Sequence, residues 1–405
     1  MRQTLRAGHD VELLQGASAF FQALVAAIEA SEQEVRMETY IFCVVSTGEQ
    51  VAAALVQAAQ RGVKVFLVMD GVGTPSLPDS WRERFDAAGV QWRIFSPLGW
   101  LGMVIPSRWR RLHRKLCVVD GVVAFCGGIN VLDDYHDPHF GTLDTPRLDF
   151  AVRVTGALVQ SVHEAMAQFW WRFQSVRSMR QGDFVQGWQA LQEAVTAGLA
   201  ARPEPSFAQG GAHRNASAQL LLRDNLRNRT GIERAYRKAI GEARHEIIIA
   251  NAYFLPGRKL RKGLMLAAKR GVRVRLLLHG RYEYFMQYYA TRPVYQALLT
   301  AGVEIHEYCV GFLHAKVAVI DAHWATVGSS NLDPLSLLLA REANVVVDDV
   351  SFARDLRDRL ELAISQGASP VDPEAYANRP WRQRLLDRVA FAVMRVLLFL
   401  NGARY

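Results

Sequence analysis

The chain has 405 residues, of which 50% are hydrophobic and 21% are charged, a balance that excludes a disordered protein. This length is large for one hydrophobic core and suits two domains of about 200 residues each. The formal net charge of +9 favours an anionic partner, such as acidic lipid, nucleic acid or a phosphate-bearing substrate, without choosing among them.

The first half of the chain alternates helix and strand patterns. An amphipathic helix pattern leads into an apolar strand over 19–42, and the same order follows over 52–71 and again over 81–95. The whole series returns over 232–308. Strands that alternate with helices predict an α/β fold with a largely parallel or mixed sheet.

The stretch from about residue 175 to 219 breaks this rhythm and ends in a segment rich in proline and glycine. Residues 184–200 within it have a helical pattern. The predicted organisation is therefore an N-terminal domain over 1–205, a C-terminal domain over 206–378 and a terminal helix over 379–405.

The two halves also share a polar motif. Each copy has histidine and lysine two positions apart, then aspartate, glycine and asparagine at identical spacing, and no other histidine in the chain has lysine two positions later. The first copy consists of His113, Lys115, Asp120, Gly127, Gly128 and Asn130, and the second of His314, Lys316, Asp321, Gly328, Ser329 and Asn331. Such a repeat predicts two catalytic halves that act together.

Apolar alternation around each motif predicts a strand, on which histidine and lysine project from one face. A turn near the aspartate then leads into a second strand that brings the asparagine back beside them. These residue types suit phosphodiester chemistry: one imidazole attacks phosphorus and the other protonates the leaving alkoxide. Lysine and asparagine donors would each stabilise the transition state by about 3–4 kcal/mol. The ammonium groups supply positive charge, so we expect neither a metal nor another cofactor.

The twice-repeated pattern H-x-K-x4-D-x6-G-x-x-N resembles the signature of the phospholipase D superfamily. The segments GSSNLDPLSLLLAREANVVV, LLRDN and IIIANAYF further resemble bacterial cardiolipin synthases of the B type. The resemblance extends over nearly the whole chain. It implies two α/β/α domains packed about a pseudo-twofold axis, with both motifs meeting at the domain interface.

The resemblance also implies roles for the site residues. His113 is favoured as the nucleophile and His314 as the acid and then base, with the reverse assignment left open. Phosphate would be bound by Lys115, Lys316, Asn130, Asn331 and Ser329. Asp120 and Asp321 complete the catalytic motif, although the resemblance implies that they are mainly structural. Asp149 and Glu342 would orient the histidines, and the halves differ because Asp149 is shorter than glutamate and Gly128 stands where the second copy has serine.

Three further segments affect the interpretation. The loop with His136, Asp137 and His139 holds three ligand types without a fourth, which is more typical of surface polar residues than of a metal site. Residues 97–115 run from apolar to basic, and residues 381–400 predict an amphipathic helix; both suit a membrane surface better than ordinary packing.

No segment has signal-peptide character, and no window reaches the roughly 18–20 apolar residues that cross a bilayer. The four cysteines form no CxxC pair and are expected to be free thiols. We therefore expect a peripheral protein on the cytoplasmic side of the membrane. By resemblance, it would transfer a phosphatidyl group from one phosphatidylglycerol to another. Phospholipid hydrolysis, a less favoured nuclease activity and a catalytically silent membrane-binding protein remain alternatives.

Overall fold

The computed structural model describes residues 5–99, 106–137, 140–180, 183–196, 213–224, 228–280, 285–333 and 340–400. The N-terminal half begins with β1 (Arg6–Gln15), α1 (Gly16–Glu29), β2 (Glu34–Thr39), α2 (Thr47–Gln60), β3 (Lys64–Asp70), α3 (Asp79–Ala88) and β4 (Gln91–Phe95). It continues with η1 (Pro106–Trp109), β5 (Arg111–Leu112), β6 (Leu116–Val119), β7 (Val123–Gly127), β8 (His136–Asp137), β9 (Gly141–Thr142), β10 (Phe150–Thr155), α4 (Leu158–Arg180) and α5 (Phe184–Thr196).

The C-terminal half repeats this order. Its elements are β11 (His213–Arg223), α6 (Gly231–Glu242), β12 (Glu246–Asn251), α7 (Arg258–Lys269), β13 (Arg273–His279), α8 (Phe285–Thr300), β14 (Glu304–Tyr308), β15 (Lys316–Ile320), β16 (Trp324–Gly328), β17 (Ala340–Asp348), α10 (Val350–Gly367), β18 (Ala368–Pro370), α11 (Pro373–Ala377) and α12 (Trp381–Leu400).

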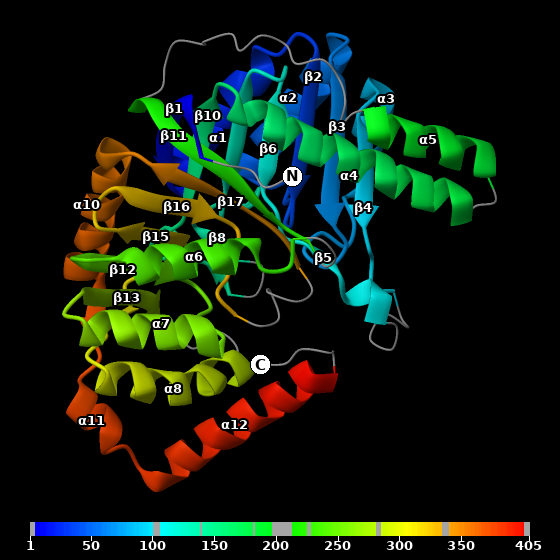
Figure 1. Cartoon of the computed structure of the whole chain (residues 1–405). Coiled ribbons are helices and arrows are strands. Elements are labelled where there is room, and N and C mark those ends of the chain that lie inside the picture. Colours follow the sequence, from blue (N-terminus) through cyan, green and yellow to red (C-terminus); the bar gives the residue numbers. More distant parts are fainter. Residues whose placement is uncertain are drawn as a thin grey trace.

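One continuous sheet runs through both halves (Figure 1). The order β4-β3-β2-β6-β7-β10-β1 in the first half matches β14-β13-β12-β15-β16-β17-β11 in the second. β1 and β11 pair antiparallel and join the two series. Strands β2, β3 and β4 are parallel, as are β12, β13 and β14, whereas the motif strands β6 and β15 run antiparallel to their neighbours β2 and β12. The α/β fold with two similar halves is confirmed.

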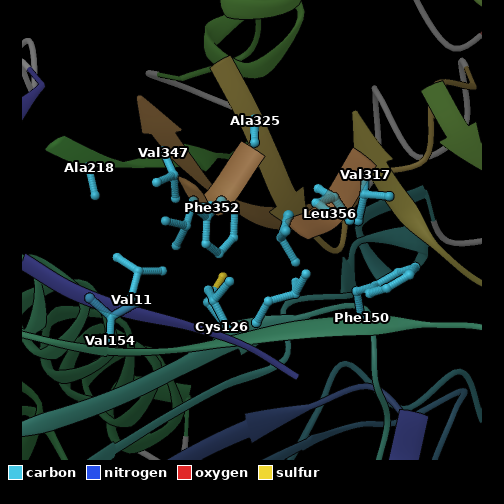
Figure 2. Packing of buried hydrophobic residues seen from close by; sticks show 14 of the residues in the cluster. Val11, Cys126, Phe150, Val154, Ala218, Val317, Ala325, Val347, Phe352 and Leu356 are labelled. Atoms are coloured by element: carbon cyan, nitrogen blue, oxygen red, sulfur yellow. The ribbon is translucent and has the colours of Figure 1, made fainter. Parts of the chain in front are cut away.

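A shared hydrophobic core fixes the halves against each other (Figure 2). It contains Val11, Phe150 and Val154 from the first half together with Val347 and Phe352 from the second, all of them buried. Each large apolar side chain buried in this way contributes roughly 1.5–3 kcal/mol. The halves therefore form one body, since separating them would expose this core. Separate cores lie under α1–α3 and under α6–α8.

The predicted helices in the junction and at the C-terminus are present as α5 and α12. Across the part of the chain that the structure describes, no helix combines the length and apolar character needed to span a bilayer.

Candidate active site

Both histidines precede the motif strands instead of lying within them, contrary to the sequence prediction. His113 lies between β5 and β6, and His314 lies just before β15. Each histidine backbone is bonded to the opposite half: the His113 amide donates to the Arg341 carbonyl (3.0 Å) and the His314 amide to the Leu148 carbonyl (2.9 Å). Because each histidine amide is bonded to the other half, the histidine lies outside the hairpin formed by its own motif strands. It also brings both motifs to the interface between the halves.

The orienting carboxylates come from the opposite half as well. His113 Nδ1 lies 3.1 Å from Glu342 Oε2, and His314 Nδ1 lies 2.6 Å from Asp149 Oδ2. Both carboxylates are buried. Each Nδ1 is therefore occupied, which leaves Nε2 of each ring for chemistry.

The two motif lysines lie in the same site. Lys115 Nζ donates to the His113 carbonyl (2.9 Å), and Lys316 Nζ donates to the His314 carbonyl. Burial and then the charge of Lys316 lower the pKa of Lys115 to about 7. The two ammonium groups thus repel each other across the interface, an arrangement that an anionic phosphate would relieve.

This geometry predicts an alkaline limb in the activity profile. The Lys115 ammonium is charged below pH 7 and loses its proton as the pH rises through about 7. The free enzyme should therefore bind an anionic substrate more weakly above pH 7, and kcat/KM should fall over the same range. Bound phosphate raises the lysine pKa, so the limb in kcat should lie at higher pH. Lys115→Arg keeps its charge and should flatten the limb; an unchanged limb in this variant would assign it to another group.

Both motif asparagines are buried after the second motif strand of their half, and the motif serine is bonded to a carboxylate. Asn130 Oδ1 accepts the Ile41 amide (3.2 Å), and Asn331 is buried beside the end of β16. Ser329 was predicted to bind phosphate, but its hydroxyl donates to Glu342 Oε2 (2.5 Å). A hydroxyl has one hydrogen, and here that hydrogen goes to the carboxylate. This hydrogen bond positions Glu342, and the phosphate-binding role of Ser329 stays a prediction.

The two departures in the first motif compensate each other. Gly128 occupies the place of Ser329, and a Cβ built there would lie 2.2 Å from Asp149 Oδ1. The shorter carboxylate of Asp149 fills the space that a serine side chain takes in the second half. Glycine is thus required because the carboxylate approaches the backbone closely.

Gly128→Ala should therefore displace Asp149 and the His314 ring that it orients. We expect turnover to fall about 10²-fold, because catalysis is sensitive to misplacement of about 1 Å. Gly241→Ala is a matched control, since a Cβ at Gly241 meets nothing within 4 Å. Equal turnover of the two variants would show that Asp149 tolerates the displacement.

The electrostatic settings of the two histidines differ. Burial by itself raises the pKa of Glu342, but His113, Lys115 and the Ser329 hydroxyl outweigh it and hold that pKa below its ordinary value. Burial instead raises the pKa of Asp149 to about 7 and holds the pKa of His314 well below its usual range. Glu342 is therefore an ionised acceptor for His113, whereas the Asp149–His314 pair can retain a proton near neutral pH.

The motif aspartates lie at the other end of the motif strands. Asp120 accepts hydrogen bonds from the amides of residues 32–34, and Asp321 from the amides of residues 244–246, at 2.8–2.9 Å. Both residues have positive φ. The four-residue strand β6 lies between His113 and Asp120 and by itself spans about 13 Å at the usual rise per residue. The structure thus does not bring these aspartates to the histidines.

Asp321→Ala should act on stability more than on chemistry. It leaves three backbone donors without their charged acceptor, so the free energy of unfolding should fall by about 3 kcal/mol in denaturant titration. The kcat of the folded fraction should change less than about threefold. Asp358→Ala, at a largely exposed aspartate, is the control. A large loss of kcat at unchanged stability would make Asp321 part of the chemistry.

The sequence analysis missed residues around the first motif. The Tyr40 ring lies 5.0 Å from the His113 ring, and Lys115 Nζ lies 5.4 Å from the Tyr40 ring centroid. Arg114, the middle residue of the first motif, points away and pairs with buried Glu38 at 2.7 Å. Tyr40 directly follows the apolar strand β2, whereas Ala252 holds the corresponding place after β12. The duplicated pattern therefore did not single out Tyr40.

The histidine-rich loop is tied to the protein by an ion pair. Asp137 Oδ2 lies 2.8 Å from Arg147, and His139 lies outside the described residues. In the described parts of the chain, no group of three or more histidine, cysteine, aspartate or glutamate side chains is arranged to hold a metal ion.

Comparison with known proteins identifies the family. The family model described as "Cardiolipin synthase, PLD-like domain" matches residues 24–140 and 236–363. Cardiolipin synthase B of Escherichia coli (strain K12) is 35% identical, with 98% of this chain and 90% of that protein covered. Cardiolipin synthase B of Salmonella typhi is 36% identical, covering 96% and 89%.

Among solved structures, phosphatidylserine synthase of Haemophilus influenzae Rd KW20 superposes with a TM-score of 0.65 at 13% identity, covering 99% of this chain and 97% of that one. At that identity the likeness shows the fold alone. The paired motifs, the duplicated fold and the relatives agree: the chain belongs to the phospholipase D superfamily, in the branch that carries the cardiolipin synthase, PLD-like domain.

Proposed function

We propose that the protein is a phosphatidyltransferase that moves a phosphatidyl group from one phosphatidylglycerol to the hydroxyl of another, forming cardiolipin and releasing glycerol. The observation that carries this proposal is the reciprocal arrangement of the site, in which each histidine is bonded to a buried carboxylate of the opposite half. Relatives at 35–36% identity bear the name cardiolipin synthase B, which supports the same substrate class.

In the first step, His113 Nε2 attacks phosphorus as the bond to the glycerol oxygen breaks. Ionised Glu342 accepts the Nδ1 hydrogen of His113, so the Nε2 lone pair is free to act as the nucleophile. His314 protonates the departing oxygen with the proton that its pair with Asp149 retains. Lys115, Lys316, Asn130 and Asn331 are proposed to hold the non-bridging oxygens.

In the second step, His314 takes the proton from the hydroxyl of a second phosphatidylglycerol. That oxygen attacks phosphorus, and the bond between phosphorus and His113 Nε2 breaks. Water in place of the lipid alcohol would give phosphatidic acid, so transfer depends on excluding water from the site.

The terminal helix supports membrane attachment. Asp387 and Ala390 of α12 are buried, whereas its large apolar residues Trp381, Leu385 and Val389 are exposed. Asp387 pairs with Arg379 at 3.1 Å. The apolar face thus points outward, as in helices that lie in a bilayer interface. We propose that residues 379–405 form a membrane-associating segment after the two catalytic domains, 1–205 and 206–378.

Residues 100–105, the apolar centre of the predicted apolar-to-basic segment 97–115, lie outside the described residues. Peripheral attachment at the cytoplasmic face remains our proposal for the location. It agrees with the cysteines, which are all free, as is usual in a reducing compartment.

The test is to incubate purified protein with phosphatidylglycerol vesicles and to measure cardiolipin, glycerol and phosphatidic acid. Cardiolipin and glycerol in equal amounts are expected. Phosphatidic acid as the main product would make the protein a hydrolase, and cleavage of DNA with no lipid product would make it a nuclease. Vesicle binding without any product would overturn enzymatic function.

A further inference from the structure

The hairpin of α4 and α5 projects past the β4 edge of the sheet (Figure 1). Small residues form the seam between the two helices: Ser175, Ser178 and Ala190 are buried there. The Ser175 hydroxyl donates to the Gly187 carbonyl (2.7 Å), and a Cβ at Gly187 would lie 2.6 Å from Met179 Cγ. The helices approach closely at Gly187, where the partly exposed Met179 side chain lies against the glycine backbone.

Beyond Ser175, the large apolar side chains of the hairpin are exposed, whereas Phe169 and Trp170 earlier in α4 are buried. The exposed set has exposed fractions between 37% and 71% and comprises Val176, Met179, Phe184, Val185, Trp188 and Leu191. A helical hairpin surrounded by water normally buries such residues in its seam. Small residues inside and large apolar residues outside are the arrangement found where helices contact lipid.

Unpaired positive charge lies next to this apolar surface. Arg172 and Arg177 of α4 are exposed and form no ion pair within the described part of the chain. Burial and the charge of Arg177 lower the pKa of Arg93, whose guanidinium lies 5.2 Å from the Trp170 ring. Arg172 lies one helical turn before exposed Val176, so the hairpin presents cations together with apolar side chains, a combination that complements an anionic surface.

We propose that the outer face of the α4–α5 hairpin docks on an anionic lipid bilayer, with Phe184 and Trp188 inserted at the interface. A second copy of the chain is a poorer occupant. Six apolar side chains fall well short of the roughly 20–30 residues that each partner of a stable dimer contributes, and a twofold contact would bring the arginines together.

This inference rests on the proposed function, because a lipid substrate places the enzyme at a bilayer. It adds a docking surface on the N-terminal half to the one proposed for α12. Two contacts from opposite halves would hold the protein in one orientation, as reversible membrane binding usually needs more than one attachment.

The experiment compares the full-length protein with Phe184→Ser/Trp188→Ser in flotation with phosphatidylglycerol vesicles and with phosphatidylcholine vesicles. Leu266→Ser/Leu362→Ser is the matched control, because these leucines are also exposed but lie on α7 and α10. We expect the hairpin variant to bind phosphatidylglycerol vesicles about tenfold or more weakly, with the control unchanged. Arg172→Glu/Arg177→Glu should lose binding to the anionic vesicles selectively.

Turnover separates this inference from the proposed function. With short-chain phosphatidylglycerol dispersed as monomers, the hairpin variant should match wild type, whereas with vesicles its apparent KM should rise at unchanged kcat. If wild type turned over neither substrate, the proposed function would be wrong. The docking proposal for the hairpin would then be tested by vesicle binding alone. Equal vesicle binding by all variants would overturn the inference. So would a wild-type dimer that becomes monomeric in the hairpin variant while vesicle binding is retained.

Discussion

Replacing His113 with alanine should abolish cardiolipin formation, with a loss of at least about 10³-fold in turnover, because alanine removes the nitrogen that is proposed to form the covalent intermediate. His314→Ala should cause a comparable loss with phosphatidylglycerol, whose glycerol oxygen needs a proton on departure. The two variants should differ with a substrate that has a nitrophenolate leaving group. Such a group departs without protonation, so His314→Ala should recover its first step and His113→Ala should not.

Mass spectrometry after an alkaline quench supplies the second readout. His314→Ala incubated with the activated substrate should carry one phosphatidyl group on His113, since the second step lacks its base. A phosphatidyl group on His314 in the His113→Ala protein would reverse the assignment. Full turnover in either variant would end the two-histidine mechanism.

Glu342→Gln should reduce turnover by about 10²–10⁴-fold while leaving the fold intact. The amide can offer a hydrogen to Nδ1, which favours the tautomer with its hydrogen on Nε2 and so blocks the nucleophile. The loss should appear in kcat, because glutamine preserves the volume of the buried side chain. Rescue is expected in Glu342→Asp only in part, since the shorter chain lengthens the contact now at 3.1 Å.

A surface pair provides the control for Glu342→Gln. His323 and Asp348 are 2.9 Å apart and both exposed, so Asp348→Asn makes the same chemical change without touching the site. This variant should keep wild-type turnover. A similar small effect from both substitutions would mean that Glu342 does not set the His113 tautomer.

The motif repeat made much of this molecule predictable. Two copies of one polar pattern, each embedded in the same helix and strand order, indicated the α/β duplication and the principal site residues. The turn role of Asp321 also followed from the resemblance. Local patterns succeed there because the residues involved are bonded within their own half, as Asp321 is to the amides preceding β12.

Contacts between the halves could not be predicted in the same way. The pairing of Glu342 with His113 depends on β5 lying beside β17, residues that are far apart in the chain. The engagement of the Ser329 hydroxyl follows from that placement. The helix α5 was predicted, but its seam with α4 was not, because small residues give no periodic apolar signal.

The crossed carboxylates have a consequence for how such a chain can change over time. A single repeat would lack the carboxylate that orients its histidine, because that carboxylate belongs to the other half. The two halves can therefore diverge only in linked sets: Gly128 with Asp149, and Ser329 with Glu342. A substitution in either set changes the orientation of the histidine in the other half, so neither half can change its site residues independently.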